Sequence, residues 1–152
     1  MRRFVITKGK GDKEMTYREL REKHQQEVNA FPFMFAFSDE QFKNGMEKLG
    51  LKEDETDKIY SIGGGGYILK TSAPAMHDMF DRHRREMEEA MNDDTFAYGA
   101  FLYELGNHEF CITYDWEPTL EALGMTVEDV LKDERLNGIF KKARHDYLEE
   151  YE

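Results

Sequence analysis

The sequence predicts an α+β fold in which a small antiparallel sheet packs against about six helices. Apolar residues recur at helical spacing along most of the chain, and several of these segments follow a capping residue. Two runs of β-forming residues flank four consecutive glycines, Gly63–Gly66, and this pattern predicts a hairpin. Because the predicted strands do not alternate with helices one by one, we expect an antiparallel sheet.

In the first half of the chain, two capping pairs mark the starts of helices. Thr16 with Glu19 and Ser38 with Gln41 have the spacing of a capping box. The segment 31–37 lies between the two predicted helices and carries four phenylalanines of one parity. Pro32 confines any strand here to a sheet edge. We expect this segment to be a buried, extended connector that feeds the core.

In the second half, helices dominate. Pro74 favours the start of a long helix that runs to Met91. The apolar spacing of residues 96–105 predicts a helix, whereas the alternation over residues 110–114 predicts a strand. Short helices are expected over residues 118–123 and after the cap Thr126, and a final helix completes the chain.

The chain has 152 residues, for which one domain is the default. Residues 1–15 are expected to be a basic, partly mobile lead-in with a short strand at 4–6, and residues 16–152 a single α+β domain. No apolar run approaches the roughly 20 residues of a membrane span. The only cysteine, Cys111, fits a reducing compartment. A cytoplasmic protein without a membrane partner is therefore predicted.

The net charge of −11 is unevenly distributed. Between Glu86 and Leu131 there are twelve carboxylates and no lysine or arginine. Such a segment repels phosphate backbones and attracts cations, so direct nucleic-acid binding through it is disfavoured. Three interpretations stay open: a solvated surface, a surface that docks on a basic protein, and a metal site. The predicted binding residues are Glu86, Glu88, Glu89, Asp93, Asp94, Asp115, Glu117, Glu121, Glu128 and Asp129, together with Gly64 and Gly65.

The glycine run admits two functional interpretations besides a structural one. Backbone N–H groups without side chains can cradle a phosphate, but Tyr67-Ile68 follows the last glycine where a P-loop needs Lys-Ser/Thr. A hairpin turn with positive φ angles is the structural interpretation. Close approach of a ligand or partner at Gly64 and Gly65 is the remaining alternative.

His108 is the best candidate for acid–base chemistry. Glu104 lies one helical turn before it and Glu109 follows it. A carboxylate at that spacing could orient the imidazole. The alternative function is therefore a small hydrolase or nucleotide-modifying enzyme that uses His108, Glu104 and Glu109 near the hairpin Gly63–Gly66.

Three stretches carry a resemblance to a family: Phe-Ala-Phe-Ser-Asp-Glu-Gln-Phe (35–42), Gly-Gly-Gly-Tyr (64–67) and Tyr-Glu-Leu-Gly-Asn-His-Glu-Phe-Cys-Ile-Thr-Tyr (103–114). Together they resemble an uncharacterised family of small acidic proteins from bacteria, their phages and mobile elements, over most of residues 16–130. The resemblance implies no catalytic role. What it implies is a context: small acidic proteins of mobile elements often act by binding host machinery, including CRISPR nucleases, and not by catalysis.

We therefore expect a non-enzymatic acidic protein that binds a basic nucleic-acid-handling host protein, with no cofactor and no metal. Such a partner is the protein class that a segment rich in carboxylates would attract. The sequence favours this function over the enzyme.

Overall fold

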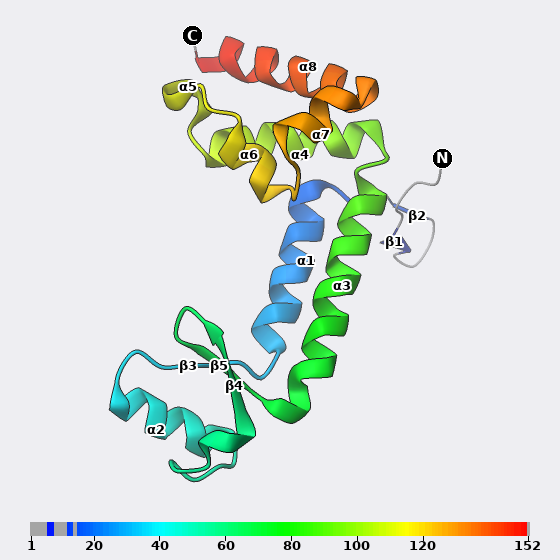
Figure 1. Ribbon diagram of the computed structural model, residues 1–152. Helices are drawn as coiled ribbons and strands as arrows, with labels where there is room; N and C mark the ends of the chain where they lie inside the picture. The colour runs from blue at the N-terminus through cyan, green and yellow to red at the C-terminus, as the bar shows by residue number, and fades with distance from the viewer. Residues whose placement is uncertain (1–5, 8–11, 14, 152) are drawn as a thin grey trace. The chain divides into compact units, whose positions relative to one another are not determined.

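The computed structural model describes residues 6–7, 12–13 and 15–151, and it confirms the α+β class. This part of the chain contains eight α-helices and five short strands (Figure 1). The strands are β1 (Ile6–Thr7), β2 (Asp12–Lys13), β3 (Met34–Phe35), β4 (Ile59–Gly63) and β5 (Gly66–Leu69). The helices are α1 (Tyr17–Ala30), α2 (Asp39–Lys48), α3 (Ala73–Ala90), α4 (Asp94–Asn107), α5 (Phe110–Thr113), α6 (Glu117–Ala122), α7 (Val127–Lys132) and α8 (Glu134–Tyr151).

Most of the lead-in predicted over residues 1–15 lies outside the described residues, including Phe4 and Val5 of its expected strand. Where it is described, β1 pairs with β2 in an antiparallel arrangement. In the described part of the chain, no helix has the length and apolar character needed to cross a membrane.

The chain forms two compact units. The first contains residues 1–23 and 85–152, and the second contains residues 24–84. The boundaries fall within α1 and α3. The single domain predicted for residues 16–152 therefore stays a prediction.

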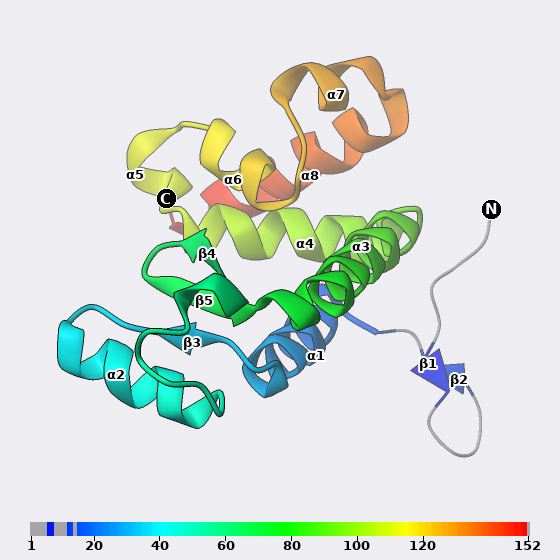
Figure 2. The same ribbon diagram turned by 60° about the horizontal axis from the view of Figure 1, so that its bottom comes forward.

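The core of the first unit lies between α4 and α8, which run side by side with α6 and α7 next to them (Figures 1 and 2). Phe101 and Phe140 are fully buried there, with ring centroids 4.9 Å apart. Because α4 buries residues on several faces, its sequence lacks the single apolar stripe of a surface helix. The helix predicted over residues 96–105 is confirmed.

The predicted helix caps are confirmed at Thr16, Ser38 and Thr126, although at Ser38 the Gln41 side chain accepts from the Phe37 N–H and so does not complete the box. At the start of α1 the Thr16 N–H donates to Glu19 Oε1 (3.0 Å) and the Glu19 N–H to Thr16 Oγ1 (3.2 Å). Thr126 and Asp129 form the same reciprocal pair before α7. At α2 the Gln41 N–H donates to Ser38 Oγ. These caps depend only on residues three apart, so the sequence alone locates them.

The second unit contains a three-stranded antiparallel sheet in the order β3-β5-β4. Met34 is opposite Tyr67, and Ile59 is opposite Leu69. These side chains share the face that packs on α2, where Met46 is fully buried. The predicted hairpin is confirmed, with Gly63 paired to Gly66 across the turn.

The expectation of a buried connector over residues 31–37 is wrong. Met34 is the residue that enters the core of this unit, at 5% exposed, whereas Phe35 is 57% and Phe37 76% exposed. The parity argument correctly placed alternate residues on opposite faces. It assigned the core to the face with more aromatic residues, but α2 covers the other face.

The strand predicted over residues 110–114 is also wrong, because α5 is a short helix there. Glu109 and Tyr114 flank it with φ angles of 53° and 54°. A helical turn brings the rings of Phe110 and Tyr114 to 5.8 Å, and Phe110 also packs on Tyr147 of α8. Phe110 thus packs on helical residues, and within the described residues no strand lies beside residues 110–114 with which they could form a sheet.

Candidate functional site

The carboxylates predicted to bind a partner lie in several different environments. Glu86 pairs with Lys23 (3.5 Å) and Asp94 with Arg135 (2.6 Å). Asp93, Asp115 and Asp129 accept backbone N–H bonds at turns and helix starts. Glu88 and Glu89 are exposed on α3. The acidic segment is therefore divided between paired carboxylates, capping carboxylates and exposed ones, and three exposed glutamates, Glu117, Glu121 and Glu128, lie around one hollow.

This hollow lies between α6 and α7 and has a volume of about 350 Å³. Gly124, with φ of +73°, turns the chain from α6 toward α7 and so brings Glu128 to the side where Glu117 and Glu121 lie. The residues that line it are Glu117, Leu120, Glu121, Met125, Thr126, Val127 and Glu128. We call this the acidic hollow.

The acidic hollow combines an apolar lining with an anionic rim. Leu120, Met125 and Val127 supply the apolar part, and the three glutamates are exposed to solvent. Lys132 pairs with Glu128 at 3.0 Å, but both side chains are more than 70% exposed, so water weakens this pair. A lysine or arginine side chain suits such a site, because its stem is apolar and its head is cationic.

A second polar cluster surrounds Glu104, which is only 1% exposed. The Tyr17 hydroxyl donates to Glu104 Oε2, and Asn107 Nδ2 donates to Oε1 at 3.1 Å. Arg21 Nε lies 3.9 Å from Oε2, and His108 Nε2 lies 3.4 Å from Oε1. Both carboxylate oxygens are thus engaged by α1 and by α4 itself, which satisfies a group that would be costly to bury alone.

Burial raises the pKa of the Tyr17 phenol well above its usual value, and the hydrogen bond to Glu104 raises it further. Since the folded state holds this proton more tightly than the unfolded chain does, the contribution to stability is complete below pH of about 10 and declines as the pH rises.

We expect Tyr17→Phe to remove this part of the alkaline loss of stability and to cost about 1 kcal/mol at neutral pH. The free energy of unfolding measured from pH 7 to about pH 11 tests it. Tyr60→Phe, which alters an exposed phenol of the second unit, is the matched control. Parallel pH profiles for Tyr17→Phe and the wild type would contradict the expectation.

Comparison with known protein families identifies the family of the chain. A model of a family of unknown function, DUF7659, matches residues 16–146. The chain belongs to this family. No curated protein and no solved structure matches the chain. The resemblance to an uncharacterised family is thus confirmed, and the family itself assigns no activity to any residue.

The structure brings together two of the three residues of the alternative enzyme. His108 and Glu104 are neighbours, and the His108 N–H caps α4 by donating to the Glu104 carbonyl. His108 Nε2 is buried and makes no hydrogen bond within the part of the chain that is described. Glu109 is exposed at the turn after α4. None of the three residues lines the acidic hollow, or the hollow formed by Thr16, Tyr17, Arg18, Gly99, Leu102 and Tyr103.

Gly64 and Gly65 form the turn of the hairpin, with φ angles of +59° and +78°. Positive φ at both central residues is typical of a type I′ turn. A Cβ at Gly65 would lie 2.5 Å from Cε1 of Phe37. The close approach that the glycine run permits is therefore made at Gly65 by a side chain of the same unit.

One further group has the donors of a metal site. On α8, ligand atoms of His145, Asp146 and Glu149 lie within 4.8 Å of one another. Asp146 Oδ2 also accepts from Tyr98 (2.6 Å) and from Lys142 (2.7 Å). The lysine already neutralises this carboxylate, so the group works as an ion-paired network on the helix surface.

Sequence reasoning missed Tyr17 and Arg21 as partners of Glu104. Tyr17 and Glu104 are 87 positions apart, so no local spacing relates them. The burial of Glu104 could have been suspected from its place among the apolar residues of α4. Reasoning from charge alone counted it with the surface carboxylates.

Proposed function

We propose that the protein is a non-enzymatic binding protein whose acidic hollow takes a lysine or arginine side chain of a basic partner. The observation that carries this is the grouping of Glu117, Glu121 and Glu128 around an apolar lining. The stem of the cationic side chain packs on Met125 and Val127, and its head meets the carboxylates.

The net charge of the chain supports the same function. At −11 it attracts a basic partner over several ångströms and speeds association, and salt screens this attraction. Basic grooves of nucleic-acid-handling proteins present such side chains in clusters. In the full proposal the partner is a cytoplasmic host protein of this class, such as a CRISPR nuclease. The present protein then comes from a phage or mobile element and antagonises that host protein.

The enzyme alternative is weaker because Glu104 is engaged. A general base needs a free lone pair directed at its substrate. Tyr17 and Asn107 donate to the two oxygens of Glu104, and its side chain is buried. Glu104 works here as a hydrogen-bond acceptor that joins α1 to α4.

Selection from a displayed library of random peptides tests the binding function. We expect the wild type to enrich peptides that contain arginine or lysine, with affinity that falls strongly between about 50 and about 500 mM salt. Glu117→Gln/Glu121→Gln should weaken the selected peptides by about tenfold, as expected for lost charge-assisted hydrogen bonds.

Glu88→Gln/Glu89→Gln is the matched control, because it removes the same charge from exposed residues of α3 that do not line the acidic hollow. Equal weakening by both double variants would show that net charge alone attracts the peptides. That outcome, or a selection in which no enriched class of peptides carries arginine or lysine, would overturn the proposal.

A further inference from the structure

The second unit has an open sheet edge at β3. In the order β3-β5-β4, one side of β3 has no neighbouring strand in the described part of the sheet. The Ala36 N–H donates to the Gly65 carbonyl (2.9 Å), in the register that pairs Met34 with Tyr67 and Phe35 with Gly66. Hydrogen bonding alternates along an antiparallel strand, so the N–H and C=O of Phe35 point away from β5 toward the open edge.

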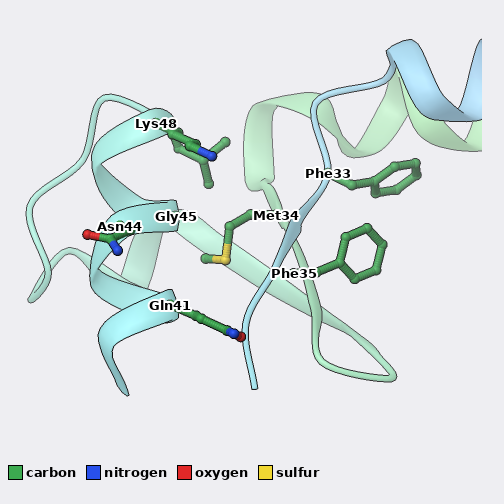
Figure 3. Close-up of a pocket in the computed structure, with 8 residues that line it drawn as sticks. Phe33, Met34, Phe35, Gln41, Asn44, Gly45 and Lys48 are labelled. Carbon is green, nitrogen blue, oxygen red and sulfur yellow. The ribbon is translucent and has the colours of Figure 1, made fainter. Parts of the chain in front are cut away.

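A groove follows this edge. It has a volume of about 300 Å³ and is lined by Phe33, Met34, Phe35, Gln41, Asn44, Gly45, Lys48 and Leu49. Figure 3 shows α2 on one side of β3, with Met34 directed toward α2 and with Phe33 and Phe35 directed away from it. We call this the β3–α2 groove.

Gly45 sets how closely α2 approaches β3. A Cβ at this position would lie 2.3 Å from Cγ of Met34, so any larger residue would displace that side chain. The face of the sheet that points away from α2 is apolar at this edge. Phe35 and Ile62 both lie over Gly66, where an added Cβ would be 3.0 Å from Phe35 Cε1 and 3.0 Å from Ile62 Cγ1. The open backbone of Phe35 therefore lies between a polar helix wall and an exposed apolar surface.

The polar side chains of α2 that line the groove differ between its two ends, with neutral Gln41 at one end and cationic Lys48 at the other. Lys48 lies toward the Phe33 end of β3, and Gln41 lies toward the other end, beyond Phe35 (Figure 3). A strand added antiparallel to β3 runs from the Phe35 end toward the Phe33 end, so its carboxyl-terminal side approaches Lys48. At the other end the Phe37 N–H is already taken by Gln41 Oε1 (2.8 Å), which limits the open ladder to a short stretch around Phe35.

We propose that the β3–α2 groove binds a short extended segment of a partner protein by strand addition, with an acidic side chain of that segment meeting Lys48. One peptide residue exchanges two backbone hydrogen bonds with Phe35. A side chain on one face of that segment packs on Phe35 and Ile62, and a carboxylate further along meets the lysine. This site lies in a different unit from the acidic hollow and selects the opposite charge, so it is independent of the function proposed above.

The test uses the full chain and a displayed library of random unstructured peptides. We expect a class of selected peptides, separate from the basic peptides of the acidic hollow, to carry aspartate or glutamate at a fixed distance after an apolar residue. N-methylation of the peptide residue opposite Phe35 should weaken binding by about tenfold, because it removes the donor to the Phe35 carbonyl. Lys48→Glu should weaken binding by a similar factor, and the Phe35 amide should become protected from hydrogen exchange when peptide binds.

Lys43→Glu is the matched control, since it changes the same charge on α2 outside the groove lining and should leave affinity unchanged. The acidic-hollow variant Glu117→Gln/Glu121→Gln should also leave it unchanged. Peptides that bind Lys48→Glu as tightly as the wild type, or that leave the Phe35 amide unprotected, would overturn the proposal. So would protection of that amide by dimerisation of the chain without peptide, which would assign the edge to a second copy.

Discussion

Replacing Glu104 by alanine should destabilise the protein by about 3–5 kcal/mol, the usual cost of removing one partner from a buried charged network. The carboxylate accepts from Tyr17 and Asn107 and is 1% exposed. Its loss leaves a buried phenol without an acceptor and opens a cavity at a fully buried position of α4.

Urea unfolding followed by the fluorescence of Trp116, the only tryptophan, measures this effect. Glu109→Ala is the control, because this exposed glutamate lies just beyond the same helix and should change stability by less than about 0.5 kcal/mol. Glu104→Gln keeps the shape of the side chain and should fall between the two. An unfolding midpoint for Glu104→Ala equal to that of the wild type would show that the cluster contributes nothing to stability.

The parts of the fold that sequence could predict are those that depend on near neighbours. The capping boxes at Thr16 and Thr126 join residues three apart, and the hairpin turn needs only two residues that tolerate positive φ. The long helix after Pro74 follows from a stripe repeated over several turns. Each of these signals is present in a short window of sequence.

The errors arose where a distant element decides the outcome. Alternation gave the faces of residues 31–37 correctly, but only the position of α2 determines that Met34 and not Phe35 is buried. Residues 110–114 have strand-like alternation, yet Phe110 packs on a helix far along the chain. The candidate site divides in the same way. Glu117 and Glu121 share a helix face by their spacing, whereas the position of Glu128 depends on the turn at Gly124.

A second charged cluster, within the second unit, makes stability depend on pH. Glu27 of α1 accepts from both terminal nitrogens of Arg82, and His83 Nε2 lies 3.2 Å from Glu27 Oε2. The ring of His83 also stacks on that of His24, with centroids 3.9 Å apart. The hydrogen bond from Arg82 lowers the pKa of Glu27 from 4.5 to about 2, with a smaller contribution from His83. These contacts join α1 to α3 inside this unit.

Since the pKa of Glu27 is lower in the folded protein than in the unfolded chain, its contribution is present above pH 4.5 and is lost as the pH falls toward 2. We expect Glu27→Gln to cost about 2 kcal/mol at pH 7, after allowance for the partial exposure of Arg82, and to flatten the pH profile over that window. The difference in free energy of unfolding between wild type and variant, measured from pH 7 to about pH 2, isolates this carboxyl from the others. Glu22→Gln, an exposed change on the same helix, should leave both stability and profile within about 0.5 kcal/mol of the wild type. A constant difference across the acid range would mean that Glu27 stabilises the unit by packing and not by its charge.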